Sequence, residues 1–160
     1  MGCVFSKRLE QRDRTFLEKG ITPSQIASGI NVLRIRRQGE KSFFTLKRHD
    51  TNELDCIEKE TEISDPEELE DVLKFLGCHL DVVINKKRRK TKFKGMEICL
   101  DEVEGLGFFI EVEKLTQENS DSLKIQEELF QFLESLGISR EDRVINGYDT
   151  LIRNKYGESA

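Results

Sequence analysis

The chain of 160 residues carries 26 lysines and arginines against 31 aspartates and glutamates, so its net charge is only −5 although 36% of it is charged. This balance argues against a nucleic-acid-binding protein and against a disordered acidic tail. No apolar run approaches the roughly 18 residues of a membrane span, and there is no secretory hydrophobic region, so we expect no membrane partner.

The first segment, MGCVFSKR, has the pattern of a lipid anchor. Gly2 follows the initiator methionine, and Ser6 stands where the myristoylation pattern places a serine or threonine. Cys3 would be available for a palmitoyl chain. A second interpretation of this segment depends on a repeat that becomes visible only further along the chain.

Several segments alternate between two kinds of side chain with a period of two, which is typical of antiparallel strands with unlike faces. In residues 32–37, Val32, Arg34 and Arg36 share one face, while Leu33 and Ile35 share the other. The other alternating segments, in chain order, are 42–47, 56–63, 96–101 and 108–113. Each predicted strand therefore leaves a polar or charged face opposite an apolar or mixed one.

The basic run KKRRK at 86–90 has two interpretations. A basic pentamer can be a nuclear signal or a nucleic-acid patch. On a strand, Lys86, Arg88 and Lys90 would instead point inward, while Lys87 and Arg89 would point outward. We favour the strand, because few aromatic residues accompany the run and the chain is acidic overall.

Helices are predicted at three places. The first begins at SDPEE, where Ser64 and Glu67 form a capping box and Pro66 is near the first turn, and it ends at Gly77. The second runs from about 120–122 to Gly137. A third is expected at about 146–156.

The first two helices indicate an internal repeat. Their apolar stripes match at a constant offset of 60 residues, and a Glu-x-Glu strand precedes each helix. The stripes are Leu69, Val72, Leu73 and Leu76 in the first helix, and Leu129, Phe132, Leu133 and Leu136 in the second. The opening MGC matches the LGC at 76–78, so we prefer to interpret residues 1–3 as the end of a helix that leads into a strand. The lipid anchor stays the alternative.

The charged faces of the strands predict a tunnel. If the sheet curls until these faces meet, it encloses a cavity lined by both signs of charge. Buried charges are costly unless they are paired or bind ions, so such a lining fits a highly charged ligand. A triphosphate with divalent cations matches it, because arginine and lysine bind phosphate oxygens and carboxylates bind Mg²⁺ or Mn²⁺. The acidic lining would be Glu58, Glu60, Glu62, Asp101, Glu111 and Glu113; the basic lining would be Arg34, Arg36, Lys47, Lys86 and Arg88.

Six segments resemble the CYTH family, which includes class IV adenylate cyclases and thiamine or inorganic triphosphatases. They are QRDRTF (11–16), LRIRR (33–37), FTLKR (44–48), EKETEI (58–63), KKR (86–88) and CLDEVEGLGFFIEVE (99–113). The resemblance implies an α+β fold over residues 1–157, with an antiparallel β-barrel of eight strands and helices packed outside it. It also implies a divalent metal, Mg²⁺ or Mn²⁺, and a triphosphate ligand such as ATP. By motif, the phosphates would be bound by Arg34, Arg36, Lys47, Lys86 and Arg88, and the metal by Glu58, Glu60, Asp101, Glu111 and Glu113.

The sequence departs from the family at its start, because the signature Glu-x-Glu-x-Lys of the first strand is missing. Either the sequence as given starts too late, or the tunnel is incomplete and activity is impaired. The resemblance implies an enzyme of the adenylate cyclase type, making cyclic AMP and pyrophosphate from ATP. The alternatives are an inorganic, nucleoside or thiamine triphosphatase, and a non-catalytic protein that binds phosphorylated ligands. A homodimer is expected only by analogy.

The four cysteines, at positions 3, 56, 78 and 99, lack the spacing of a metal site. We interpret them as small buried residues in a reducing compartment, which favours a cytoplasmic protein.

Overall fold

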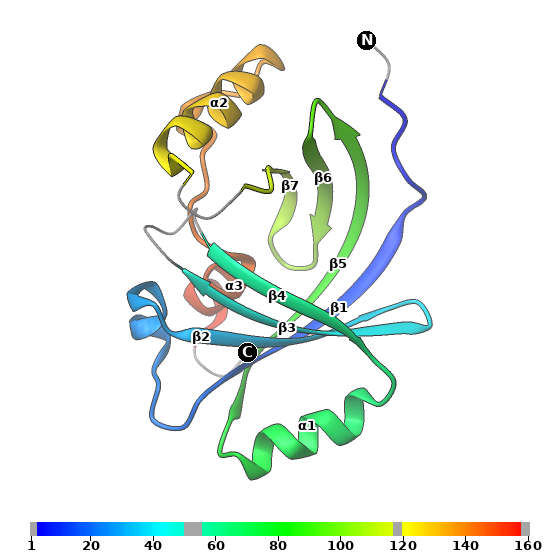
Figure 1. The fold of residues 1–160 in the computed structure, drawn as a ribbon, viewed down its shortest axis with the longest axis vertical. Helices are drawn as coiled ribbons and strands as arrows, with labels where there is room; N and C mark the ends of the chain where they lie inside the picture. Colours follow the sequence, from blue (N-terminus) through cyan, green and yellow to red (C-terminus); the bar gives the residue numbers. More distant parts are fainter. Residues whose placement is uncertain (1–2, 50–55, 117–119, 158–160) are drawn as a thin grey trace.

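The computed structural model describes residues 3–49, 56–116 and 120–157, and its main feature is one antiparallel sheet (Figure 1). Seven strands make up the sheet within these residues, in the spatial order β4-β3-β2-β1-β5-β6-β7. Their bounds are β1 Leu9–Leu17, β2 Asn31–Gln38, β3 Lys41–His49, β4 Cys56–Ile63, β5 His79–Phe93, β6 Met96–Val103 and β7 Gly107–Glu113. The predicted strands are all present.

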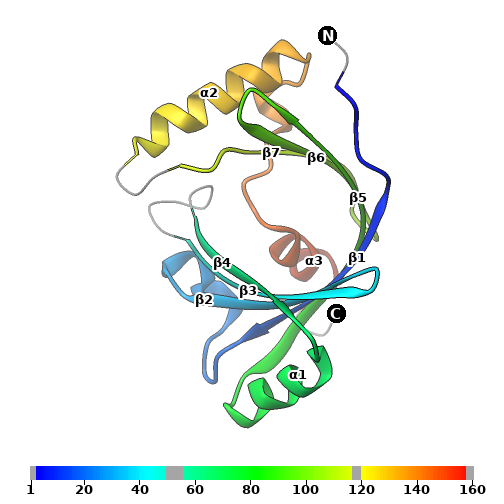
Figure 2. The same ribbon diagram turned by 45° about the vertical axis from the view of Figure 1, so that its right-hand side comes forward.

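The sheet curls strongly, so its two ends turn toward each other around a concave face (Figure 2). The strands β4 and β7 form the two edges, and within the described residues they are not hydrogen-bonded to each other. The predicted curled sheet with two unlike faces is confirmed, and the sheet is open at the seam between these two acidic strands. We call the concave face, which carries Asp13, Arg36 and Lys86, the inner face.

The outer face of β1, β2 and β3 is covered by the helix α1, Pro66–Phe75. Leu33 and Ile35 are buried there together with Phe16 of β1 and Leu73 of α1. Arg36, one residue further along β2, lies on the opposite face against Asp13. The predicted alternation of residues 32–37 is therefore confirmed.

The start of α1 differs in one detail from the sequence prediction. The N-cap is Asp65 and not Ser64, because the Asp65 carboxylate accepts a hydrogen bond of 2.9 Å from the backbone N–H of Glu68. Pro66 occupies the first helical position, which fixes the preceding residue as the cap. The predicted Ser64–Glu67 capping box is wrong by one residue.

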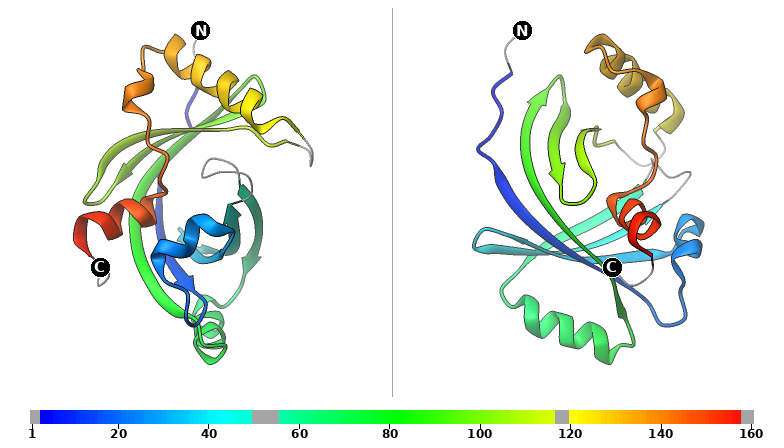
Figure 3. Two further views of the ribbon diagram at one scale, coloured as in Figure 1. Left: turned by 90° about the vertical axis from the view of Figure 1, so that its left-hand side faces the viewer. Right: turned by 180° about the vertical axis from the view of Figure 1, so that it is seen from behind.

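Two further helices follow the sheet: α2 at Ser122–Ser135 and α3 at Tyr148–Tyr156. Short 3-10 helices occur at Pro23–Ser28 and Arg140–Asp142. The helix α3 packs on the inner face at one end of the curl, where Ile152 contacts Val82 and Ile84 of β5 (Figure 3). An exterior position was expected for every helix. The helix α3 instead lies on the inner face, because the apolar residues Val82 and Ile84 are buried by packing against it.

Residues 3–8 run along β5 without regular structure. The backbone N–H of Ser6 donates to the Lys90 carbonyl at 2.8 Å, and the Thr91 hydroxyl donates to the Val4 carbonyl at 2.9 Å. The predicted helix end at residues 1–3 and the acylation position Gly2 lie largely outside the described residues. None of the helices in the described part of the chain is long and apolar enough to cross a membrane.

The burial of the four cysteines differs from the expectation. Cys99 is buried, Cys56 and Cys78 are half-buried, and Cys3 is exposed. The prediction of buried small residues is wrong for Cys3, because the segment that carries it lies on the surface along β5.

Candidate functional site

The centre of the inner face is built around a bidentate ion pair between β1 and β2. Asp13 and Arg36 are register partners, and the carboxylate accepts two hydrogen bonds of 2.7 Å from the guanidinium. Burial alone would raise the pKa of Asp13, but the hydrogen bond and charge of Arg36 outweigh it and lower that pKa. The carboxylate therefore stays ionised and fixes the direction of the arginine.

A second pair of the same kind lies on the other half of the sheet. Arg88 of β5 donates two hydrogen bonds, of 2.7 and 2.5 Å, to its register partner Asp101 of β6. Tyr148 of α3 donates its hydroxyl hydrogen to the same carboxylate at 2.9 Å. Both Asp101 oxygens are thus engaged by protein donors.

Between these two pairs lies Lys86, whose residue surface is only 6% exposed. Its ammonium is 3.8 Å from Asp13 and 3.9 Å from Asp101, which is beyond hydrogen-bond distance, and it lies 5.0 Å from the centre of the Tyr148 ring. Burial, with a further contribution from the charge of Arg88, lowers the pKa of Lys86 to about 8. Within the described residues this buried cation has no hydrogen-bond partner.

Two glutamates of β7 meet the same cluster from the open edge. Glu111 contacts the Arg88 guanidinium and shares a hydrogen bond with Glu113. Burial would raise the pKa of Glu111, but the charge of Arg88 outweighs it and the pKa is lowered. Desolvation, together with the hydrogen bond and charge of Glu111, raises the pKa of Glu113 to about 7. Near neutral pH the two carboxylates therefore share a proton.

The opposite edge of the inner face carries a looser network. Arg34 donates to the Thr45 hydroxyl at 3.1 Å and to Glu58 and Glu60 of β4 at 3.1 and 3.4 Å. The Nε of Arg34 is buried and has no hydrogen-bond partner among the residues that the structure describes. Lys47 is half-buried, and its charge acts on Glu111 across the curl. The glutamates of β4 are exposed, because β4 is an edge strand that pairs only with β3.

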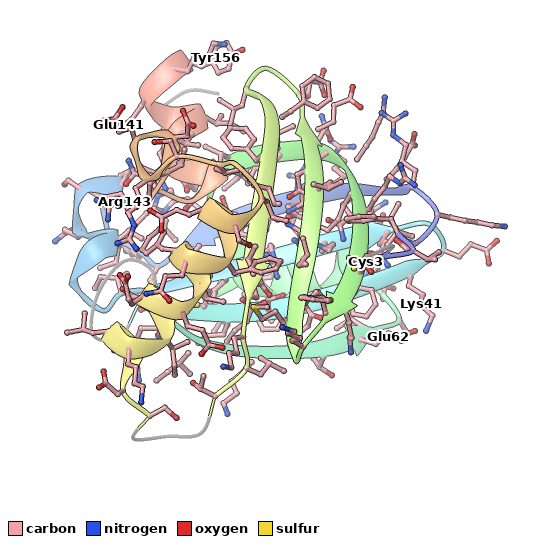
Figure 4. All side chains as sticks on the ribbon, turned by 90° about the horizontal axis from the view of Figure 1, so that it is seen from above. Cys3, Lys41, Glu62, Glu141, Arg143 and Tyr156 are labelled. Carbon is pink, nitrogen blue, oxygen red and sulfur yellow. The ribbon has the colours of Figure 1, made fainter. Side chains whose placement is uncertain are left out.

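The structure brings most of the predicted site residues onto the inner face. Their immediate partners differ from one residue to the next. All five predicted phosphate-binding cations lie there, and Lys87 and Arg89 point outward as expected. Lys90 shares the side of Lys86 but is paired with Glu97 at 3.1 Å. Glu62 lies at the far end of β4 and is paired with Lys41 at 2.9 Å, away from the cluster (Figure 4).

Three residues of the cluster were not assigned a role from the sequence. Asp13 was noticed only as part of a motif, although its alternation with Gln11 and Thr15 places it on the inner face. Thr45 lies in the alternating segment 42–47, but alternation does not reveal its hydrogen bond to Glu60. Tyr148 carried no signal beyond an apolar position on a helix, and its contact with Asp101 spans 47 residues of sequence.

The carboxylates of the inner face are oxygen donors of the kind that a divalent metal needs. Within the described residues, no three potential ligand side chains gather into one group. The paired carboxylates of Glu111 and Glu113 are nevertheless a hard oxygen set beside buried cations. Mg²⁺ commonly binds one or two carboxylates together with substrate phosphates and water. The residues therefore fit a metal that is shared with a phosphorylated ligand, while the metal role predicted for Asp101 stays a prediction.

A curled antiparallel sheet with buried arginines, a buried lysine and acidic edges defines the class of triphosphate tunnel proteins. The family model of the CYTH domain matches residues 7–148, and the chain belongs to the CYTH family.

The similar proteins agree with this assignment. A protein of Methanocaldococcus jannaschii, named "Putative adenylate cyclase", is 32% identical over 150 residues, which cover 92% of this chain and 84% of that protein. The structure of the PH1819 protein from Pyrococcus horikoshii matches with a TM-score of 0.82 and 29% identity, covering 96% of this chain and 88% of the other. A Hippeastrum protein, described as a "Putative adenylyl cyclase" with a dominant triphosphatase activity, shares the fold, with a TM-score of 0.60 at 21% identity and coverage of 94% of this chain and 84% of the other.

Proposed function

We propose that this protein binds a triphosphate on the inner face and acts on it as a divalent-metal-dependent enzyme. The observation that supports the proposal best is Lys86, a buried ammonium without a hydrogen-bond partner among the described residues, held between two Arg–Asp pairs. Its two carboxylate neighbours lie at 3.8 and 3.9 Å, so its hydrogen-bond donors stay unused, and a buried ammonium in this state favours an anionic ligand. Phosphate oxygens can supply the missing acceptors.

Each residue of the cluster has a defined part in this proposal. Arg34, Arg36, Lys47, Lys86 and Arg88 bind phosphate oxygens, and the carboxylates predicted as metal ligands are Glu58, Glu60, Asp101, Glu111 and Glu113. Asp13 takes two donors of Arg36 and leaves one terminal nitrogen for the ligand. A bound Mg²⁺ or Mn²⁺ would bridge to the phosphates and neutralise charge that develops during transfer.

The leading reaction is the one in the name of the M. jannaschii relative, the formation of a cyclic nucleotide. There the ribose 3′-hydroxyl attacks the α-phosphorus of ATP, the bond from that phosphorus to the bridging oxygen breaks, and pyrophosphate leaves with the electron pair. The attacking hydroxyl gives up its proton to water. Hydrolysis is the second candidate, with water attacking the γ-phosphorus. The phosphate-binding cations favour it as well, because they bind phosphates and do not select a nucleobase.

Product analysis with ATP and Mn²⁺ tests the proposal. Cyclic AMP with pyrophosphate supports the cyclase, and orthophosphate supports the hydrolase. Arg34→Glu should reduce triphosphate affinity at least 10-fold, while Arg12→Glu, which makes the same change of charge at an exposed position of β1, should leave it unchanged. Equal affinity in both variants would refute the inner face as the binding site. Tight triphosphate binding without either product would show a binding protein instead of an enzyme.

A further inference from the structure

The helix α3 is fixed on the sheet by a buried ion pair. The Arg153 guanidinium lies 3.0 Å from the carboxylate of Asp81 in β5, and the two side chains are 7% and 5% exposed. Arg153 also donates a hydrogen bond of 2.9 Å to Asp149, one turn earlier in α3. Removing one partner of such a pair leaves an uncompensated charge away from water, which is strongly unfavourable. This ion pair therefore sets where α3 lies on β5.

A bulge between β1 and β5 brings Asp81 to this contact. The pairing of the two strands is regular up to Arg14 and shifts before Phe16, so Thr15 faces two residues of β5, Asp81 and Val82. In a regular strand these two side chains would point to opposite faces, but a bulge redirects one of them. The Asp81 carboxylate accepts a hydrogen bond of 3.3 Å from the Thr15 hydroxyl, and Thr15 is only 4% exposed. The carboxylate thus meets α3, which packs on the inner face against Val82.

The same helix carries Tyr148 into the candidate site. The Tyr148 hydroxyl donates to Oδ2 of Asp101 at 2.9 Å, and the ring centre lies 5.0 Å from the Lys86 ammonium. The Arg88 guanidinium donates to the same Oδ2 atom at 2.5 Å. The Lys86 ammonium is 3.9 Å from this oxygen, which is too far for a hydrogen bond. The tyrosine and the arginine therefore occupy the oxygen that Lys86 would otherwise use.

The placement of Arg153 and that of Tyr148 are linked, because both belong to one helix of nine residues. If α3 shifted on the sheet, the Tyr148 hydroxyl would leave Asp101. A carboxylate oxygen has two lone pairs, so Oδ2 could then accept a hydrogen bond from Lys86. A direct bond between Lys86 and Asp101 would compete with any phosphate oxygen for the ammonium.

We propose that Arg153 is a positioning residue of the inner-face site. Its ion pair with Asp81 fixes α3 so that the Tyr148 hydroxyl occupies Asp101 and the Lys86 ammonium stays available to a phosphate oxygen. The last step rests on the function proposed above, whereas the placement of Tyr148 does not. Arg153 itself lies outside the predicted phosphate-binding set and acts through Tyr148.

The tyrosines report the placement of α3 without any ligand. The chain has no tryptophan, and its two tyrosines, Tyr148 and Tyr156, are the first and last residues of α3 (Figure 4). In Tyr156→Phe, which alters an exposed contact, the fluorescence comes from Tyr148 alone. Arg153→Met in this background should make acrylamide quenching about 2-fold stronger, because a loosened helix exposes the ring. Lys155→Met, which removes an exposed cation from the same helix, should leave the quenching unchanged.

The affinity for a triphosphate tests the effect on the site. With a non-hydrolysable ATP analogue and Mn²⁺ at neutral pH, Arg153→Met and Tyr148→Phe should each raise the dissociation constant about 10-fold, because either change lets Asp101 bind Lys86. Arg153→Met added to Tyr148→Phe should change the constant by less than about 2-fold, since coupled residues are not additive. A merely structural role of Arg153 would give additive effects. Lys155→Met should bind as the unchanged chain does.

Circular dichroism shows whether each variant is folded. If Arg153→Met does not fold, two milder variants take its place. Asp81→Asn removes the counter-charge and should act as Arg153→Met does, while Arg153→Lys keeps the charge and should retain most of the affinity. Unchanged quenching in a folded Arg153→Met, or additive effects with Tyr148→Phe, would overturn the proposal. If the unchanged chain binds no ATP analogue, the proposed function fails, while the quenching still decides whether Arg153 fixes Tyr148.

Discussion

Asp13 and Arg36 are joined by two hydrogen bonds of 2.7 Å each, and they are direct partners across β1 and β2. Asp13 is only 1% exposed, so water cannot replace the arginine as its main partner. The same arrangement recurs between Arg88 and Asp101. The inner face thus holds two hydrogen-bonded Arg–Asp pairs and a lysine that is near both aspartates but hydrogen-bonded to neither.

Asp13→Asn should destabilise the fold by about 3 kcal/mol or more, because it leaves the buried Arg36 without its counter-charge. Urea unfolding followed by circular dichroism measures the change. Asp71→Asn is the control, since it removes a carboxylate from the surface pair with Lys74 and should have little effect. The folded-state pKa of Asp13 is lowered, so its stabilising contribution is present above the unfolded pKa and is lost as the pH falls. Equal stability of the two variants at neutral pH would contradict this role.

The first turn of α1 provides a test of the cap. Asp65→Ala should lower the free energy of unfolding by about 1 kcal/mol, because the Glu68 N–H loses its acceptor. Ser64→Ala should change it by much less, since Ser64 precedes the cap. Thermal unfolding of the two variants in the same buffer makes the comparison. If Ser64→Ala were the more costly, the capping box read from the sequence would be the correct one after all.

The faces of the strands were predictable because a period of two needs only local sequence. Alternation alone placed Arg34 and Arg36 opposite Leu33 and Ile35. It also separated Lys86 and Arg88 from Lys87 within a run of five basic residues. The apolar stripe of α1 and its end at Gly77 followed from helical spacing in the same way.

The partners of those side chains were not predictable, because they depend on register and on contacts between distant segments. Asp101 was interpreted as a metal ligand, yet its oxygens accept hydrogen bonds from Arg88 and Tyr148. The place of Tyr148 depends on α3 packing inside the curl, and no local pattern encodes that. The exposure of Glu58 and Glu60 likewise follows from β4 being an edge, which only the pairing order reveals.

Metal affinity should rise with pH around neutrality. The pKa of Glu113 is raised to about 7, and a metal ion must displace the proton that Glu113 shares with Glu111. Below pH 7 the affinity for Mn²⁺, measured in the presence of a non-hydrolysable triphosphate, should fall up to 10-fold per pH unit. Glu113→Gln should bind Mn²⁺ more weakly and lose most of this pH dependence. Glu128→Gln, on the exposed side of α2, serves as the control and should retain the full dependence.

Triphosphate affinity should decrease above pH 8, because the pKa of Lys86 is lowered to about 8 and only its charged form attracts phosphate. Isothermal titration calorimetry should show the dissociation constant rising up to 10-fold per pH unit above that value, with proton uptake on binding. The folding stability of the unliganded protein depends on pH in the opposite direction. Between pH 8 and about 10.4, the unfolded chain binds more protons at this site than the folded chain, so Lys86 makes the fold more stable as the pH rises.

The variant Lys86→Arg tests whether the pH dependence of triphosphate binding comes from deprotonation of Lys86. The guanidinium stays protonated across the range, so this variant should bind triphosphate with little change between pH 8 and 9.5. Lys86→Met should bind weakly at every pH, since it lacks the charge. Lys87→Met, one residue along β5 and on the outer face, should behave as the unchanged chain does. A pH profile that is the same with lysine and with arginine at position 86 would show that the phosphates are bound elsewhere.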